Sequence, residues 1–435
     1  MSRRLRPEDW LFTLFVFLLP FQSIVPFKVA AFQLQVADLA FVVLLMAWLG
    51  RLLSRPSEFR FRWFYLFLAA YLIAVLLSAV GSADLSRSTV KLAGKLYLVL
   101  IALVSFSLID SMHQVRRAFH AWLGGAGVVL TLSGLGIIAF YMGSTDPDIN
   151  IVVHPIYGSL PAGPYPRIEG LFAYPAMFSN FLGITWMIAI ACTLNGWLTE
   201  RNLCIFGVLL IIVNAFTLTP GIGGIFLSTG ILLFLIKKVE APIAAGSYLA
   251  AGIIAAVLFL AAASFTLFSF EQSGVRLPLA DGEVRASHRA MAWSTGLQTF
   301  LQFPILGKGV GLPVSEAIYT DPNGNNQLLT DAHNTYVSVL AETGLVGAAA
   351  FFGMLFFVVL KLVQSVPKAR WVYICLLLAL IDAVFYQGLT GSYEDARHLW
   401  VVIGIAAAMG SDAFSTEEKS AETSPDPPTG EARSS

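Results

Sequence analysis

Three residues that could bind an anion, Arg285, Arg289 and Trp293, follow one another at intervals of four positions. On a helix this spacing places them on one face. Arginine side chains bind phosphate through paired hydrogen bonds, which suggests a clamp for a diphosphate. The alternative is that these side chains reach toward lipid head groups as interfacial anchors. The spacing alone favours neither interpretation.

A candidate base, His333, stands in the segment Asp331-Ala332-His333-Asn334, directly before a long apolar run. An imidazole titrates near neutral pH, which suits a general base that takes the proton of a sugar hydroxyl. The alternative is a structural histidine beside a helix N-cap, since Asp331 and Asn334 both suit that position. Glu342 lies inside the apolar run, where a carboxylate is costly and is expected to pair with a cation or a backbone group.

Further cations border other apolar runs. Arg87, Lys91 and Lys95 again have a spacing of four, and lead into an apolar segment. They could guide a lipid phosphate, or they could be ordinary interfacial anchors. Arg167 ends a Pro- and Gly-rich stretch, and we expect it to face the same compartment as His333.

The composition predicts a membrane protein that must position these residues. Of 435 residues, 57% are hydrophobic and 12% are charged, whereas a soluble chain carries about 25% charged residues. The net charge is zero, so bulk charge indicates no nucleic-acid partner. The three cysteines lie in apolar runs and indicate neither a disulfide framework nor a zinc site.

The predicted fold is an all-α polytopic membrane protein with about twelve transmembrane helices, because a span needs roughly 20 apolar residues. The expected spans lie at about 10–26, 36–53, 63–80, 92–109, 119–141, 171–193, 203–219, 220–236, 246–270, 335–360, 371–390 and 396–410. The seventh and eighth are joined only by Thr219-Pro220-Gly221, so they could instead form one broken hairpin. Residues 1–410 form the predicted membrane domain.

The distribution of Lys and Arg predicts the orientation. With a cytoplasmic N-terminus, most basic residues fall in cytoplasmic loops, and both termini are expected in the cytoplasm. Two long loops, about 142–170 and 271–334, then face the periplasm. The second contains an amphipathic segment, 286–303, expected to lie along the membrane surface. The polar tail, 411–435, is expected to be disordered.

Other reaction classes lack their motifs. No cluster of His, Asp and Glu has convincing metal spacing, and no P-loop, Rossmann glycine pattern or nucleophile elbow is present. His154 and His288 are expected to be surface residues. The sequence therefore indicates neither a metal nor a cofactor.

Three motifs resemble the O-antigen ligase and polymerase superfamily. Arg167-xx-Gly170-Leu171-Phe172-xx-Pro175 is similar to its upstream block. Arg289-xxx-Trp293, followed by Phe303-Pro304-Ile305-Leu306-Gly307-Lys308-Gly309, is similar to its arginine, tryptophan and glycine signature. His333-Asn334-x-Tyr336, then Leu340-x-Glu342-x-Gly344-Leu345-x-Gly347, resembles the continuation. Their order and spacing make the set more specific than any single motif.

The resemblance implies a metal-independent, inverting glycosyltransferase of the inner membrane. Its donor would be a glycan on undecaprenyl diphosphate, and its acceptor a hydroxyl on the periplasmic side. Carried onto this chain, His333 would be the base and Arg289 would hold the diphosphate. Arg285 and Arg167 would support Arg289. The expected substrate-binding residues also include Trp293, Arg87, Lys91, Lys95, Glu342, Asn334 and Tyr336.

One departure from the family pattern affects this assignment. Relatives commonly have a Ser-Arg-Gly type stretch where this chain has Thr217-Leu218-Thr219-Pro220-Gly221. The arginine is missing, so either another cation replaces it, for example from the Arg87-Lys91-Lys95 series, or the substrate class differs.

Three functions remain open. A ligase would transfer finished polysaccharide to lipid A–core, and a polymerase would join repeat units with the same chemistry. The ligase is favoured modestly, with a cavity open to membrane lipids on the outer leaflet. A transporter is the alternative from another class. It predicts ionisable residues at the bilayer midplane, whereas the cations here gather at the outer surface.

Overall fold

The structure is a computed structural model that describes most of the chain. The described residues are 6–25, 27–29, 32–55, 62–143, 153–154, 166–238, 240–268, 277–279, 282–284, 289–320, 326–365, 370–411 and 414. Arg285, His288 and almost all of the tail from residue 412 onward lie outside these ranges, as do large parts of both predicted periplasmic loops.

Thirteen α helices make up nearly all of this part of the chain. They are α1 (Pro7–Leu18), α2 (Val36–Ser54), α3 (Trp63–Val80), α4 (Leu85–Leu108), α5 (Met112–Tyr141), α6 (Pro175–Leu194), α7 (Glu200–Ala215), α8 (Gly221–Lys237), α9 (Pro242–Phe268), α10 (Arg289–Gln302), α11 (Thr335–Ser365), α12 (Arg370–Leu380) and α13 (Arg397–Met409). Between α12 and α13, the helix continues as a π turn (Ile381–Tyr386) and a 3-10 turn (Gln387–Leu389).

The strands are short hairpins attached to this bundle. Antiparallel pairing joins β1 (Phe27–Val29) to β2 (Phe32–Leu34), β3 (Val153–His154) to β4 (Arg167–Ile168), β5 (Leu277–Leu279) to β6 (Gly282–Val284), and β7 (Ala317–Thr320) to β8 (Asn326–Leu329). No larger sheet occurs among the described residues, so the predicted all-α class is confirmed.

Each of the twelve predicted spans overlaps a helix, although α1 ends at Leu18 and covers only part of the span predicted at 10–26. Eight helical segments are long and apolar enough to cross a membrane, and they confirm a polytopic membrane protein. The other four predicted spans form the shorter helices α1, α7, α8 and α13. The seventh and eighth segments are separate helices, because α7 ends at Ala215 and α8 begins at Gly221.

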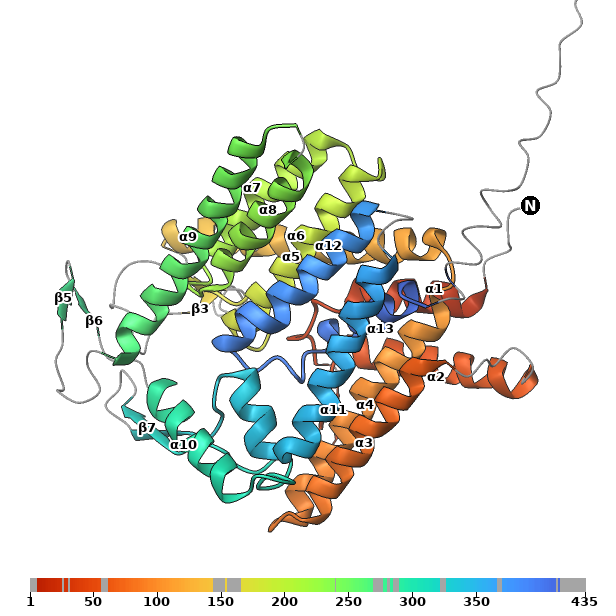
Figure 1. The fold of residues 1–435 in the computed structure, drawn as a ribbon, viewed down its shortest axis with the longest axis vertical. Coiled ribbons are helices and arrows are strands. Elements are labelled where there is room, and N and C mark those ends of the chain that lie inside the picture. The colour runs from red at the N-terminus through yellow and green to blue at the C-terminus, as the bar shows by residue number, and fades with distance from the viewer. Residues whose placement is uncertain are drawn as a thin grey trace, which may run out of the picture.

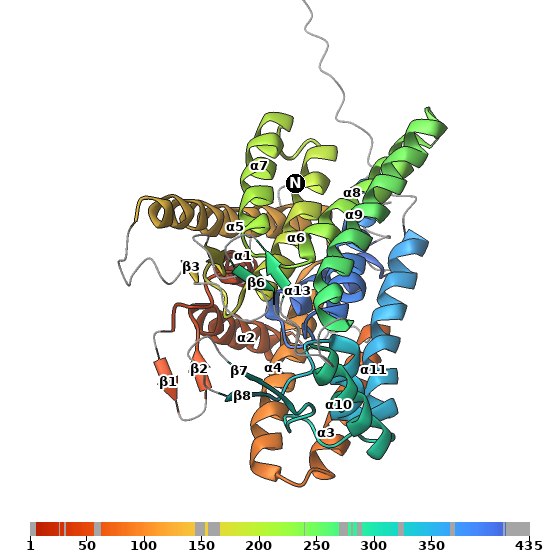
Figure 2. The same ribbon diagram turned by 90° about the vertical axis from the view of Figure 1, so that its left-hand side faces the viewer.

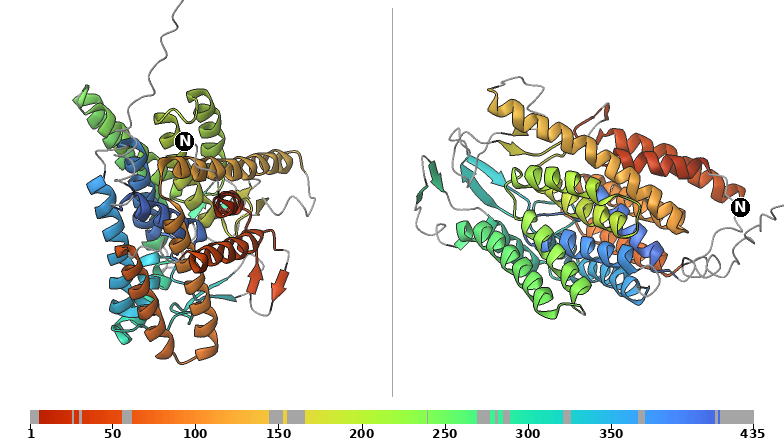
Figure 3. Two further views of the ribbon diagram at one scale, coloured as in Figure 1. Left: turned by 90° about the vertical axis from the view of Figure 1, so that its right-hand side faces the viewer. Right: turned by 90° about the horizontal axis from the view of Figure 1, so that it is seen from above.

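Helix α6 forms the centre of the bundle. It is apolar on all faces, as expected for a helix surrounded by other helices, and most of its residues are buried. Helices α5, α7, α8 and α12 pack around it, and the ring of Trp122 in α5 stacks on Phe181 at 4.9 Å. Figure 3 shows α1 beside α5 at the edge of the same group.

A second group of helices positions the candidate site. Helices α3 and α4 pack together, and α11 and α13 pack against them (Figure 1). Helix α10 is not a candidate span and lies alongside α11 at one end of the bundle, near β7 and β8 (Figure 2). Ala292 of α10 is fully buried, whereas Leu301 is 73% exposed. The helix is therefore two-faced, in agreement with the amphipathic segment predicted at 286–303.

Candidate functional site

The site begins at a break in α11. Gly344 has φ 62° and ψ −164°, which interrupts the helical backbone inside the span. The loop after α10 enters this break and bonds to the main-chain groups there. Lys308 N donates to Ala341 O at 2.9 Å, Gly309 N donates to Glu342 O at 3.2 Å, and Leu345 N donates to Pro304 O at 2.8 Å. The loop therefore supplies hydrogen-bond partners for the main-chain N–H and C=O groups at the break. Such groups need partners within the protein because the membrane interior holds no water.

Glycines allow the loop and the broken helix to approach this closely. Gly307 has φ 76°, and a methyl group on it would overlap the main chain of Glu342. The Oγ of Ser78 in α3 donates to the carbonyl of Glu342 at 2.7 Å and accepts from Val310 N at 3.1 Å. The glycine signature at 307–347 thus fixes α10 relative to α11. The side chain of Glu342 is buried, and the charges of Lys91 and Lys95 act on it.

His333 lies at the start of α11 in a constrained backbone conformation. Its φ is 49°, in the left-handed region that side chains other than glycine rarely adopt. The neighbouring residues hold it there. Ala332 is fully buried, and Asn334 caps α11 by accepting from the backbone N–H groups of Tyr336 and Val337 at 3.0 and 3.1 Å. Asn334 Nδ2 also donates to Leu389 O at 3.1 Å.

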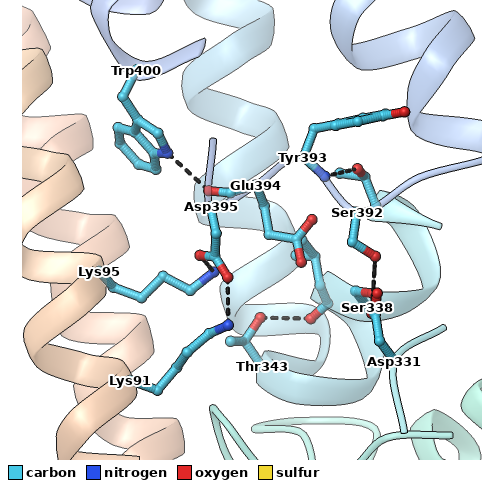
Figure 4. A network of polar contacts seen from close by, with 12 residues as sticks. Lys91, Lys95, Asp331, Ser338, Thr343, Ser392, Tyr393, Glu394, Asp395 and Trp400 are labelled. Atoms are coloured by element: carbon cyan, nitrogen blue, oxygen red, sulfur yellow. Dashed lines mark hydrogen bonds and ion pairs between the residues drawn. The ribbon is translucent and has the colours of Figure 1, made fainter. Parts of the chain in front are cut away.

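The imidazole of His333 contacts the carboxylate of Asp331. Nδ1 of His333 lies 2.7 Å from Oδ2 of Asp331, and the His333 side chain is 42% exposed. Burial raises the pKa of Asp331, but hydrogen bonds from His333, Ser392 and Ser338 outweigh it, so the pKa lies below its usual value. Figure 4 shows Ser392 and Ser338 beside Asp331. Asp331 is therefore ionised at neutral pH.

Arg289 is the first residue of α10 and is half-buried. Burial lowers the pKa of its guanidinium, and the phenol of Tyr393 is close enough to interact with its charge. The backbone of Tyr393 in turn donates to Thr335 Oγ1 at 3.0 Å, two residues beyond His333. The segment 390–396 therefore connects the arginine of α10 to the histidine at the start of α11.

Arg167 approaches the same place from the segment that precedes α6. Its Nε donates to Thr217 O at 3.2 Å. Burial and, to a smaller extent, the positive charge of Arg289 lower its pKa to about 10. The two guanidinium groups are thus within electrostatic reach of each other. Two guanidinium groups within electrostatic reach of each other could together bind an anion such as a diphosphate.

Glu169 is the acidic neighbour of this arginine pair. Burial raises its pKa to about 7, although the charge of Arg167 lowers it. At pH 7 the carboxyl is thus only partly ionised. Arg167 therefore has a weak internal counter-ion whose charge depends on pH.

The lysines of α4 have a partner of their own. Lys95 is almost fully buried and lies 2.6 Å from Asp395, and Lys91 also pairs with Asp395 (Figure 4). Burial raises the pKa of Asp395, but the two lysines lower it well below its usual value. The third member of the series, Arg87, donates its backbone N–H to Asp84 at the exposed start of α4.

Two aromatic residues of the predicted set pack into this region. Tyr336 stacks on Phe352 with ring centroids 5.3 Å apart, and its hydroxyl donates to Phe385 O at 3.2 Å. Trp293 is half-buried in α10, one turn beyond Arg289. Arg285 belongs to the part of the chain that is not described, so its place relative to Arg289 stays a prediction.

Sequence reasoning missed the segment Ser392-Tyr393-Glu394-Asp395. It contacts Asp331, Arg289, Lys91 and Lys95, and Tyr174 donates to Ser392 O at 3.4 Å. The available signal was a short polar run with two adjacent acids between the last two predicted spans. Among the described residues, no group of three or more His, Cys, Asp or Glu side chains could hold a metal ion.

The comparison with protein families matches the region that contains the break, α10 and His333. The model for the family described as O-Antigen ligase matches residues 179–352. The matched stretch includes Arg289, Glu342 and Gly344, whereas Arg167 and the segment 390–396 lie outside it. No curated protein matches the chain. Through residues 179–352, which make up less than half of its length, this chain is similar to the O-antigen ligase family.

Proposed function

We propose that this protein is an O-antigen ligase-like glycosyltransferase. It moves a polysaccharide from undecaprenyl diphosphate to a hydroxyl of lipid A–core at the periplasmic face of the inner membrane. One observation carries the proposal. Two half-buried arginines from separate elements, Arg167 and Arg289, are within electrostatic reach of each other, close to the segment that holds the half-exposed His333.

The chemistry divides between the two kinds of residue. His333 accepts the proton of the acceptor hydroxyl as the oxygen forms its bond to the anomeric carbon. The bond from that carbon to the diphosphate oxygen breaks, and its electron pair stays on the leaving diphosphate. Arg167 and Arg289 stabilise the charge that develops there. Attack from the face opposite the leaving group inverts the anomeric carbon.

Arg167, which belongs to the upstream family block, lies beside the turn from which the second family arginine is missing. Its guanidinium donates to Thr217, the first residue of that turn. The lysines of α4 are poor replacements for the missing arginine, because Asp395 already pairs with both. In this proposal Arg167 and Arg289 bind the diphosphate without an arginine from the turn before α8, and the donor class is retained.

A repeat-unit polymerase is the second candidate, because it uses the same donor chemistry and differs in the acceptor. The transporter interpretation finds some support in the π and 3-10 turns after α12, which interrupt a candidate span near the buried Asp382. The family match nevertheless includes Arg289 and His333. Cytoplasmic termini and a periplasmic site remain part of the proposal.

A deletion strain separates these functions. Its lipopolysaccharide is run on a gel and its undecaprenyl-linked glycans are extracted. Bare lipid A–core, with long polysaccharide left on the carrier, identifies a ligase. Lipid A–core that bears a single repeat identifies a polymerase. If both fractions are normal and a His333→Ala variant has no phenotype, the transferase proposal is wrong.

A further inference from the structure

The carboxylate of Asp331 does not act as the cap of α11. Asn334 already caps α11, since its Oδ1 accepts from two backbone N–H groups of the first turn. No backbone N–H bonds to the Asp331 side chain among the described residues; its carboxylate instead accepts only from side chains. Oδ2 lies 2.7 Å from Nδ1 of His333, and Oδ1 accepts from Ser392 Oγ at 2.9 Å and from Ser338 Oγ at 3.2 Å.

The two serines fix the position of this carboxylate. Ser338 lies one turn into α11, and Ser392 belongs to the segment between the last two helices. The serine hydroxyls also lie 3.0 Å from each other. The serines support this position from two separate elements, and the carboxylate's own hydrogen bond to Nδ1 orients the imidazole.

The main chain removes the remaining freedom of His333. Thr335 N donates to Gly391 O at 2.9 Å, and Ala332 is fully buried. The left-handed conformation at His333, with φ 49°, is a strained one that persists only where the surroundings enforce it. The constrained backbone of His333 and the carboxylate of Asp331 together fix the orientation of the imidazole ring.

From this geometry we infer that Asp331 is a positioning residue for His333, holding the imidazole in the tautomer that carries its proton on Nδ1. This inference rests on the proposed function. An ionised carboxylate accepts hydrogen bonds and donates none, so Nδ1 must be the donor. Nε2 then carries a lone pair. Within the described part of the chain no hydrogen bond engages Nε2, and the side chain is 42% exposed. Nε2 is therefore the atom that takes the proton of the acceptor substrate's hydroxyl group.

The arginines, the imidazole of His333 and the carboxylate of Asp331 then have three separate roles. Arginine holds the donor, the imidazole takes the proton, and Asp331 acts only through the imidazole. Loss of Asp331 should therefore lower turnover without weakening donor binding. An amide at this position can donate to Nδ1 and so favour the wrong tautomer, which in a comparable Asp–His pair costs up to about 10⁴-fold in kcat.

The test compares variants of the purified full-length protein in lipid nanodiscs. The probes are undecaprenyl-diphosphate-linked polysaccharide as donor and lipid A–core as acceptor. We expect Asp331→Asn to lower kcat by about 10²- to 10⁴-fold, with the KM for donor within about threefold of the wild-type value. Asp331→Glu should recover part of the lost kcat, because it restores an acceptor for Nδ1.

The matched control removes the serine bonds and leaves the carboxylate beside the imidazole. We expect the double variant Ser338→Ala/Ser392→Ala to keep kcat within about tenfold of the wild type, since each lost neutral hydrogen bond is worth only ~1 kcal/mol. If kcat falls as far in this variant as in Asp331→Asn, the role of Asp331 is structural: its carboxylate links α11 to the segment 390–396 and does not act through His333. The inference is then overturned.

His333→Ala separates this inference from the proposed function. If His333→Ala is inactive while Asp331→Asn has wild-type kcat, only the role of Asp331 is wrong. If His333→Ala itself transfers glycan at the wild-type rate, the proposed function fails.

Discussion

Substituting Gly344 by alanine should damage both stability and turnover. Gly344 has φ 62° and ψ −164°, a region that is accessible essentially only to glycine. A side chain held there costs about 1–3 kcal/mol. The new methyl group would also overlap the main chain of Ile305, which has no rotamer to change. Overpacking of this kind adds about 1–3 kcal/mol.

The sum, about 2–6 kcal/mol, is a large share of the 5–15 kcal/mol that stabilises a typical protein. The loop entering the break also sets the position of α10, so the distance between Arg289 and His333 should change as well. We therefore expect Gly344→Ala to unfold at a clearly lower temperature and to turn over more slowly. Thermal unfolding in detergent and glycan transfer in nanodiscs measure the two effects.

Gly353→Ala is the matched control in the same helix. A methyl group on Gly353 meets no heavy atom within 4 Å, and alanine favours a helix over glycine by roughly 0.5–1 kcal/mol. This variant should be as stable as the wild type or more so. If Gly344→Ala unfolds at the same temperature as Gly353→Ala and has the same turnover, the break in α11 does not hold the site together.

Three further outcomes follow from the charges around the site. Burial gives Glu169 a pKa of about 7, so its carboxyl is mostly neutral at pH 6 and mostly ionised at pH 8. The ionised carboxylate competes with the donor diphosphate for Arg167, so the KM for donor should rise about threefold between pH 6 and pH 8. Glu169→Gln should remove this rise. Arg167→Lys should raise the KM for donor more than tenfold, because a lysine cannot bind phosphate through a planar fork; an unchanged KM would mean that Arg167 does not contact the diphosphate. Lys95→Met should cost about 1–3 kcal/mol of unfolding free energy, because Asp395 loses one of its two lysine partners and keeps Lys91. The double variant Lys95→Met/Asp395→Asn should cost less than the sum of the single variants; additive costs would show that the two side chains act independently.

The helices were predictable because apolar length is a local property. All twelve predicted spans overlap helices, and the amphipathic segment at 286–303 contains α10. The break at Gly344 was not predictable from periodicity, since the apolar pattern of α11 continues through it. Only the approach of Pro304, Ile305 and Gly307 from a distant loop explains why glycine stands there.

The sequence proposed the residue types of the candidate site, but it could not give their pairings. It singled out Arg289, Arg167 and His333, and it offered both Asp331 and Asn334 as helix caps, of which Asn334 performs that role. It also could not show that Lys91 and Lys95 pair with Asp395, at least 300 positions away. Ion pairs between distant segments depend on how the helices pack, and no local pattern encodes them.

The most direct test of the central claim is glycan transfer by the His333→Ala variant. Purified wild-type and variant proteins in nanodiscs receive the undecaprenyl-diphosphate-linked donor and lipid A–core, and both glycosylated lipid A–core and released undecaprenyl diphosphate are measured. We predict that the variant binds the donor with an unchanged Kd and transfers glycan at least about 10²-fold more slowly. Transfer at the wild-type rate would contradict His333 as the base.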